Sequence, residues 1–131
     1  MRVALAGVLA CGLIAPAMAQ KPQVDWATAR HLTVTMVDYR FEPDHLVLDH
    51  GVPYVLHMVN RGGDVHEFTA PDFFAASLVR DPHLISRGGD QVVLQPGATA
   101  DVALVPLHAG RFDLRCADHD WDGMVGEIDV K

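Results

Sequence analysis

Short runs of alternating polar and apolar residues, separated by turn residues, dominate the sequence after its first 30 positions. In residues 33–39 the side chains alternate with a period of two, which is typical of a strand with one buried face. Further short runs, most of them bounded by turn residues, follow at residues 46–48, 54–59, 65–69, 91–94, 99–105, 111–116 and 125–130. Seven or eight short strands in about 100 residues predict an all-β fold, namely a two-sheet β-sandwich with Greek-key connections.

This strand pattern lapses between residues 69 and 91. Residues 72–79 could form a short helix, and a loop is expected over residues 80–90. With 131 residues, the chain has room for one domain of ordinary size. Its composition is 50% apolar and 21% charged, which is typical of a globular protein and not of a disordered one.

The N-terminus has the pattern of a secretory signal peptide. An almost continuously apolar stretch at residues 3–16 is followed by Ala-Met-Ala at residues 17–19, a cleavage pattern, so we predict cleavage after Ala19 and export to the periplasm. The apolar stretch is short for a membrane span, and polar residues 20–23 follow it at once. No membrane span is expected in the mature chain.

The alternative for the N-terminus is a lipoprotein signal. Residues 8–11 loosely resemble a lipobox that would lipidate Cys11, but the apolar run continues past Cys11, which disfavours this reading. The expected organisation is therefore a signal peptide (1–19), a flexible lead-in (20–30) and one domain (31–131).

Loss of the signal peptide changes both the net charge and the number of cysteines. The mature chain keeps 9 basic and 17 acidic residues, a formal charge of −8. This balance argues against a binder of nucleic acid or anionic membranes, because both need clustered cationic side chains. Cys116 becomes the only cysteine, so it cannot form an internal disulfide. In an oxidising compartment its thiol is expected to be buried, paired between chains or bound to a metal.

The segment around Cys116 is rich in metal-binding side chains. Cys116, His119 and Met124 follow a Cys-x2-His-x4-Met spacing, in a loop between two predicted strands. A thiolate, two imidazoles and a weak thioether suit copper in electron transfer. Zinc would accept the Cys and His, but it has little use for a Met. The site needs one more imidazole.

His66 is the best candidate for that imidazole. It follows a Gly-Gly turn at the start of a predicted strand, which would place it at an end of the sandwich, where loops cluster. Any one of these side chains alone is more often structural, but their joint occurrence in an exported all-β chain favours a metal site. The other histidines are expected to be structural or solvated: His31, His45, His50, His57, His83 and His108.

On these residues the sequence resembles the cupredoxins, the small blue-copper proteins. The Cys-x2-His-x4-Met loop, with Gly126 two residues after Met124, is similar to that of plastocyanin and pseudoazurin. Residues 60–66 resemble the family's Asn-containing turn before the first His ligand. The resemblance covers about residues 33–131.

The resemblance implies a cupredoxin sandwich that holds one type 1 copper ion. Its ligands would be His66, Cys116 and His119 in the equatorial plane and Met124 as the axial ligand. The implied function is that of a small electron carrier that cycles between Cu(II) and Cu(I), and not that of an enzyme. Backbone N–H groups near Glu67 and Asp118 are expected to donate hydrogen bonds that tune the sulfur.

Two departures from the family pattern place negative charge near the expected metal. Glu67 stands where plastocyanins have an Asn that helps tie the ligand loops together, and Asp118 stands where a Pro often precedes the second His. Because negative charge favours Cu(II) over Cu(I), we predict a lower reduction potential than that of typical relatives.

The resemblance also implies how electrons would leave. The second His of these proteins reaches the surface as the electron port, which would be His119 here. Trp121 would either contact a redox partner or cap the core. Asp118, Asp120, Asp122 and the acidic net charge favour a basic partner, such as a cytochrome or an oxidase domain. A monomer is expected.

Other classes of function fit the sequence less well. Without a second mature cysteine or a His-x-His pair, the dinuclear and trinuclear copper centres are excluded. A Cys116–His119 nucleophilic enzyme would lack an evident substrate cleft. The serious alternative is a copper-binding module for copper delivery, storage or resistance, because it would use the same ligands.

Overall fold

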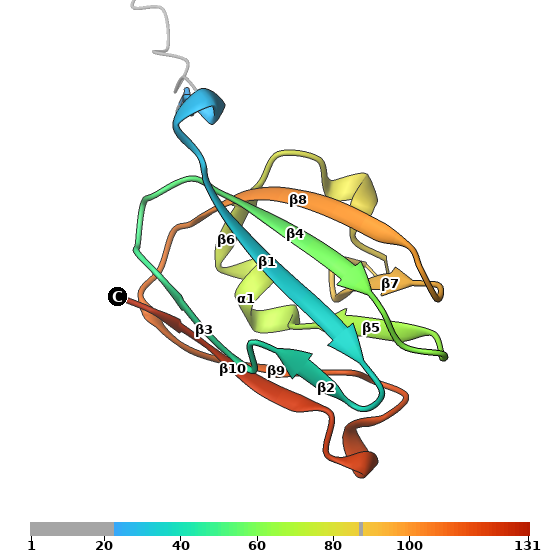
Figure 1. The fold of residues 1–131 in the computed structure, drawn as a ribbon. Helices are drawn as coiled ribbons and strands as arrows, with labels where there is room; N and C mark the ends of the chain where they lie inside the picture. Colours follow the sequence, from blue (N-terminus) through green and yellow to red (C-terminus); the bar gives the residue numbers. More distant parts are fainter. Residues whose placement is uncertain (1–22, 87) are drawn as a thin grey trace, which may run out of the picture.

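Two five-stranded sheets pack face to face in the computed structural model, which describes residues 23–86 and 88–131 (Figure 1). The first sheet has the order β2 (Arg40–Glu42), β1 (Arg30–Val37), β4 (Tyr54–Asn60), β8 (Thr99–Pro106) and β6 (Ser77–Val79). The second has the order β3 (His45–Leu48), β10 (Val125–Val130), β9 (Gly110–Arg115), β5 (His66–Thr69) and β7 (Gln91–Leu94). The predicted all-β sandwich is confirmed. The predicted signal peptide and Cys11 lie outside the described residues.

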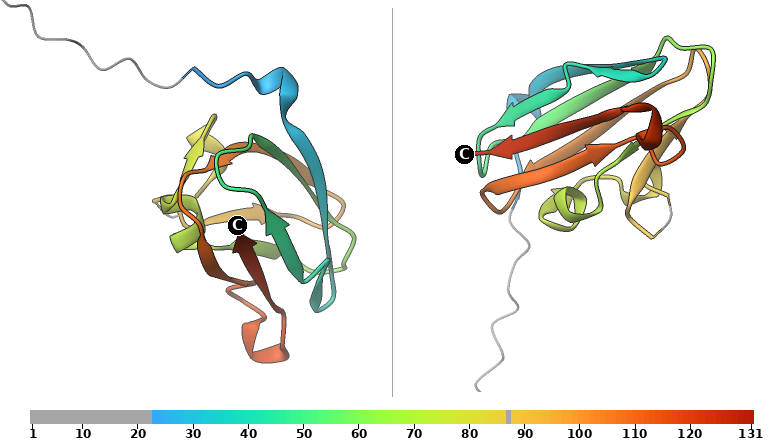
Figure 2. Two further views of the ribbon diagram at one scale, coloured as in Figure 1. Left: turned by 90° about the vertical axis from the view of Figure 1, so that its left-hand side faces the viewer. Right: turned by 90° about the horizontal axis from the view of Figure 1, so that it is seen from below.

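Both sheets are mixed. β1 pairs with β4 in parallel, and β3 pairs with β10 in parallel, while the other pairs are antiparallel. The parallel pairs arise because the chain leaves the first sheet after β2, adds β3 to the second sheet and then returns as β4. Figure 2 shows the two layers edge-on.

The core follows from the alternation of side chains along the strands. On β4, Tyr54, Leu56 and Met58 are buried, and the residues between them are less so. Phe68 and Leu114 face them from the second sheet and are also fully buried. Each such side chain contributes roughly 1.5–3 kcal/mol on burial, so this interior holds the frame on which the loops are mounted.

The irregular stretch differs from the sequence prediction. The predicted helix over residues 72–79 is wrong in its second half, because α1 spans only Pro71–Ala75 and β6 (Ser77–Val79) follows it. Pro71 is suited to the first turn of a helix, whereas residues 77–79 gain more by pairing with the free edge of β8. A short 3-10 turn, η2 (Pro82–Leu84), lies in the loop that follows.

The start of the domain is also built differently from the prediction. Residues 26–28 of the predicted lead-in form a 3-10 turn, η1 (Trp26–Thr28), which Asp25 caps through the N–H of Ala27. β1 begins at Arg30 and ends at Val37, so Asp38 and Tyr39 form the turn to β2. β2 itself was not predicted.

Three loops meet at one end of the sandwich, at the lower right of Figure 1. They are the β1–β2 turn, the β4–β5 loop and the β9–β10 loop, which contains the 3-10 turn η3 (Asp120–Asp122). In the part of the chain that the structure describes, no helix is long and apolar enough to cross a membrane.

Candidate metal centre

His66, Cys116 and His119 come together at this end of the sandwich. Their side-chain donor atoms all lie within 4.8 Å of one another. The Cys116 Sγ is 3.8 Å from His66 Nδ1 and 3.4 Å from His119 Nδ1. His66 and Cys116 are fully buried, and His119 is partly exposed.

The strands explain this convergence. His66 is the first residue of β5, and Cys116 directly follows the last residue of β9, which lies beside β5. Side chains alternate along β9, so Leu114 and Cys116 share a face and are buried, and Phe112 on the same face is partly buried. His119 then follows three residues later, in the turn before η3.

The spacing of the three donor atoms fits one metal ion. Sulfur and nitrogen ligands at about 2.0–2.3 Å from a metal, roughly 120° apart, lie about 3.5–3.8 Å from one another. The two sulfur–nitrogen distances of 3.8 and 3.4 Å agree with this geometry. A thiolate and two imidazoles suit a copper or a zinc ion, so the cluster has the donors and the spacing of a metal site.

Met124 closes the loop that carries the other two residues. The N–H of Cys116 donates to the carbonyl of Met124 (3.0 Å), and the N–H of Met124 donates to the carbonyl of His119 (3.1 Å). Gly123, with a φ of 86°, makes the left-handed turn that returns the chain. The Met124 side chain is fully buried, and its role as a fourth ligand stays a prediction.

Glu67 links the β5 side of the site to the loop. Its backbone N–H donates to Cys116 Sγ (3.4 Å), as expected, and its buried carboxylate accepts from the Cys116 thiol (3.0 Å). The N–H of Asp118 donates to Glu67 Oε2 (3.3 Å), and it also acts on the sulfur, where it lowers the pKa of the Cys116 thiol, as expected. The carboxylate therefore holds together the same segments that an Asn was expected to tie.

The environment of Cys116 keeps its sulfur protonated in the absence of a metal. Burial, followed by the hydrogen bond to the Glu67 carboxylate, raises the pKa of the Cys116 thiol to about 11. A metal ion that binds here must displace this proton, because thiolates and not thiols are metal ligands.

The β1–β2 turn supplies two residues that sequence reasoning missed. Asp38 Oδ1 accepts a hydrogen bond from His66 Nε2 (2.7 Å), and Asp38 Oδ2 accepts from the N–H of Gly63 (2.8 Å). These bonds, with that of Gly63 first, hold the pKa of the Asp38 carboxyl below its usual value. The sequence signal was weak, because Asp38 and His66 are 28 residues apart and belong to no motif.

Tyr39 covers the other imidazole. Its ring centroid is 4.7 Å from that of His119, with the planes tilted by 36°, and its hydroxyl donates to Asp64 Oδ2 (2.9 Å). Trp121, which is 79% exposed, donates from Nε1 to the carbonyl of Asp118. This exposure excludes the prediction that Trp121 caps the core.

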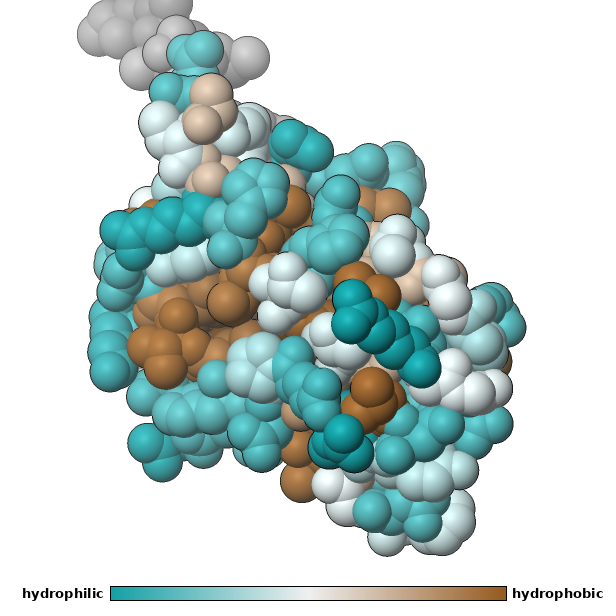
Figure 3. Space-filling view, viewed as in Figure 1, coloured by the Kyte–Doolittle hydropathy of each residue, from teal (hydrophilic) through white to brown (hydrophobic). Residues whose placement is uncertain are grey.

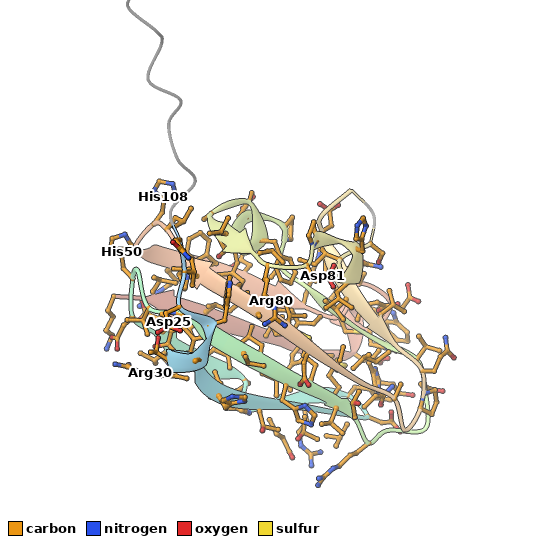
Figure 4. The ribbon with its side chains drawn as sticks, turned by 90° about the horizontal axis from the view of Figure 1, so that it is seen from above. Asp25, Arg30, His50, Arg80, Asp81 and His108 are labelled. Carbon is orange, nitrogen blue, oxygen red and sulfur yellow. The ribbon has the colours of Figure 1, made fainter. Side chains whose placement is uncertain are left out.

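The remaining histidines lie apart from the cluster. His57 pairs with Asp101 (2.6 Å) and His45 lies near Glu127 (3.6 Å). His50 and His108 lie near each other at one end of the sandwich (Figure 4), and His50 Nε2 is 2.9 Å from the carbonyl oxygen of Leu107. Within residues 23–86 and 88–131, no second group of three His, Cys, Asp or Glu side chains is close enough to hold a metal.

The surface around the site is mainly hydrophilic. In Figure 3 the loops at the lower right carry mostly polar side chains with isolated apolar spots. The larger apolar area lies instead over the opening between the sheets, beside β3. The exposed large side chains at this end include Trp121 and the half-exposed Tyr39 and Val125.

Comparisons with known proteins bear on the family and the fold. The family described as "Cupredoxin-like domain" matches residues 7–130. A crystal structure of auracyanin B has a TM-score of 0.59 at 19% identity, over 79% of this chain and 90% of that one. Dithionite-reduced auracyanin from the photosynthetic bacterium Roseiflexus castenholzii has the same score at 12% identity, over 79% and 98%.

A third similar structure comes from a copper-handling protein. It is the metal-binding domain of the Cu(I)-exporting P-type ATPase of Streptococcus pneumoniae, with Cu(I) (TM-score 0.53, 12% identity, 79% of this chain and 87% of that one). At these identities the likeness shows a shared fold alone. A search of curated proteins found no match.

Proposed function

Since this chain belongs to the family of cupredoxin-like domains, we propose that it is an exported type 1 copper protein that carries electrons. The observation that carries the proposal is the convergence of His66 Nδ1, Cys116 Sγ and His119 Nδ1 at the end of the sandwich. These three atoms, with the Met124 thioether, would hold one copper ion, which when bound supplies a Cu(II)/Cu(I) couple.

The protein's own residues prepare the site for rapid electron transfer. The paired strands β5 and β9 fix His66 and Cys116, and the closed loop fixes His119. Electron transfer is fast when ligands barely move between the two oxidation states, and this hydrogen-bonded frame restricts such movement. Cys116 gives up its proton on loading, and the N–H of Glu67 then faces a thiolate.

His119 is the proposed electron port. It is the one partly exposed side chain of the three, and Tyr39 and Trp121 present aromatic surface next to its loop. Aromatic residues are enriched at the centres of protein interfaces. A redox partner that docks on this end would lie close to the buried Cys116 and His66.

The charge around the port favours a basic partner. Asp118, Asp120 and Asp122 lie in the same loop as His119, and Asp64 accepts a hydrogen bond from the Tyr39 hydroxyl. Arg115 is 3.8 Å from Asp120 and offsets part of this charge. Acidic surroundings attract a basic cytochrome or oxidase domain and act mainly on the rate of encounter.

A copper carrier is the second candidate, because one protein of similar fold is a metal-binding domain of a copper exporter. Both functions use the same ligands. They differ in exchange: a carrier must release copper to an acceptor, whereas an electron carrier must retain it through many redox cycles.

The deciding experiment adds Cu(II) to the purified mature protein and records visible and EPR spectra. We expect an intense thiolate-to-copper band that is absent in Cys116→Ser and retained in His57→Gln, a matched change at a distant histidine. If the band is missing from the wild type or survives in Cys116→Ser, the type 1 assignment is wrong. Ten cycles of ascorbate reduction and reoxidation beside a copper chelator then separate the functions, since a copper carrier would lose its metal.

Export is proposed on the N-terminal sequence. Expression of the full chain in a Gram-negative host, followed by N-terminal sequencing of the periplasmic fraction, should give a chain that begins at Gln20. A cytoplasmic product that retains its first residues would contradict the proposed location.

A further inference from the structure

The structure pairs the buried His66 with a carboxylate from a separate part of the chain. Asp38 lies in the turn between β1 and β2, in the sheet opposite to that of His66. Its Oδ1 is 2.7 Å from His66 Nε2, the ring nitrogen that does not face Cys116. We propose that Asp38 is a positioning residue of the metal centre, which fixes the ring of His66 and favours the oxidised metal through its negative charge. This inference rests on the proposed function.

The hydrogen bond determines which nitrogen of His66 is free to bind a metal. A carboxylate accepts, so Nε2 carries the proton, and in the neutral ring this leaves the lone pair on Nδ1. Nδ1 is the nitrogen that lies 3.8 Å from Cys116 Sγ. Since the His66 side chain is fully buried, water does not compete with Asp38 for Nε2.

Two donors meet at Asp38, and this explains why the residue is a carboxylate. Oδ1 accepts from His66, and Oδ2 accepts from the N–H of Gly63. An Asn offers one carbonyl oxygen and one NH2 group. Its oxygen would accept from one of the two donors, but its NH2 group would then face the other donor and leave it without an acceptor. An Asp is therefore the side chain of this length that serves both.

Gly62 gives the pair the space it needs. A Cβ at this position would overlap Asp38 Oδ1 and lie 2.7 Å from His66 Nε2. Asn60 fixes the turn, because its Oδ1 accepts from the N–H of Gly62 (2.9 Å). The β4–β5 loop is thus shaped around the contact between Asp38 and His66.

The charge of Asp38 acts on the metal through the imidazole ring. A carboxylate that accepts from a ligating histidine raises the basicity of the ligand, and losing such a partner weakens metal binding about 10- to 100-fold. Because the more basic ligand stabilises the more highly charged ion, Asp38 favours Cu(II) over Cu(I).

The test compares Asp38→Asn and Asp38→Ala with Asp101→Asn. Asp101 is the matched control, since it also accepts from a histidine (His57, 2.6 Å) but lies on the outer surface of β8, away from the site. The first measurement needs no copper: long-range proton–nitrogen NMR correlation of the 15N-histidine-labelled apo-protein at fixed pH. We expect His66 to be protonated at Nε2 in the wild type and in Asp101→Asn, and to lose this preference in Asp38→Ala.

The second measurement is made on the copper-loaded proteins. Relative to Asp101→Asn, both Asp38 variants should bind Cu(II) about 10- to 100-fold more weakly in competition with a chelator. Their potentials should rise, by about 59 mV for each tenfold loss of Cu(II) over Cu(I) affinity. Because Asn retains one acceptor, the Cu(II) affinity and the potential of Asp38→Asn should lie between those of the wild type and those of Asp38→Ala.

Each result bears on one idea. If wild-type His66 is not protonated at Nε2, or if Asp38→Ala leaves both its NMR pattern and the potential at the values of the control, the positioning role is overturned. A folded wild type that fails to bind copper but shows the expected His66 pattern overturns the proposed function instead. Asp38→Asn, which keeps the size of the side chain, supplies the result if Asp38→Ala does not fold.

Discussion

At the scale of single residues, the site combines a buried thiol with a carboxylate that faces it. The two groups are compatible in the apo-protein because the Cys116 thiol donates to Glu67 Oε2 over 3.0 Å. When a bound metal replaces the thiol proton, which is released to solvent, the contact would change from a hydrogen bond to a repulsion between like charges. Glu67 therefore acts oppositely on the two states of the protein: it stabilises the apo thiol and adds negative charge to the loaded site.

The first prediction concerns the apo thiol. With a pKa of about 11, Cys116 should react slowly with iodoacetamide at pH 7–9, and thiolate absorbance should appear only well above pH 9. The unfolded chain, with an ordinary thiol pKa, loses this proton first as the pH rises. The thiol's contribution to apo stability is therefore complete below about pH 9 and lost toward pH 11. Alkylation monitored by mass spectrometry checks the first part, and rapid labelling at pH 7 would contradict it.

The second prediction is that Glu67→Gln raises the reduction potential. Removing a charge within 3.0 Å of the sulfur disfavours Cu(II), while the amide keeps an acceptor for the N–H of Asp118. A shift of about 59 mV corresponds to a tenfold change in the ratio of Cu(II) to Cu(I) affinity. Redox titration measures the shift, with Asp101→Asn as the control, and a potential equal to that of the wild type would contradict the prediction.

At the scale of elements, the loop from β4 to β5 depends on a single buried amide. Asn60 is fully buried, donates to the carbonyls of Asp64 (2.8 Å) and Leu94 (2.9 Å), and accepts from Gly62. It therefore holds the loop that carries Gly62 and Gly63 and ties it to the end of β7. The resemblance to the family's Asn-containing turn located this residue in the sequence.

The third prediction is that Asn60→Ala destabilises the apo-protein by about 2–4 kcal/mol, because it removes three hydrogen bonds and leaves buried backbone groups unpaired. Urea unfolding followed by circular dichroism measures the loss. Gln95→Ala, an exposed change just after β7, should stay within about 0.5 kcal/mol of the wild type. Equal stability of the two variants would mean that Asn60 is not the anchor of the loop.

The long strands could be predicted from sequence because a period of two is a local signal. Residues 91–94 and 125–130 have the predicted bounds as β7 and β10, and 54–59 extends by one residue as β4. The three-residue strands β2 and β6 are too short for a period of two to be recognised, and each pairs with a longer neighbour. Propensity alone could not separate residues 77–79 from the end of a helix.

The residues of the site also divide into those that the sequence could predict and those that it could not. Cys116, His119 and Met124 are close in sequence, so their spacing is a signal, and His66 could be added from its turn. Asp38 and Tyr39 reach the site only because the first sheet brings the β1–β2 turn over the second. Such a contact depends on how the sheets pack, and nothing in the local sequence encodes it.

At the scale of the whole molecule, the residues of the site gather at one end of the sandwich, and the body of the sandwich lies between that end and the opposite side. The opposite side, seen in Figure 4, carries Asp25 and Asp81 together with Arg30 and Arg80. Asp25 and Asp81 contribute to the same negative net charge as the acidic residues near the port. Their distance from a partner docked at His119 decides whether they influence its approach.

The fourth prediction uses this separation. At physiological ionic strength, exposed charges are screened beyond about 8 Å, so only acids near the docking surface should steer a basic partner. Replacing Asp118 and Asp122 with Asn should slow electron transfer to a basic c-type cytochrome several-fold at low salt. The same change at Asp25 and Asp81, which leaves an equal net charge, should leave the rate close to that of the wild type.

Stopped-flow kinetics over a series of salt concentrations measures the electron-transfer rates of the wild type and of both double variants. The wild-type rate should fall as salt rises, and the rates of all three proteins should converge near 1 M, where the screening distance is about 3 Å. If the two double variants slow the reaction equally, net charge and not its placement governs the encounter. If the wild-type rate does not depend on salt, the partner does not dock through this acidic end, and the apolar contacts of Tyr39 and Trp121 must account for recognition.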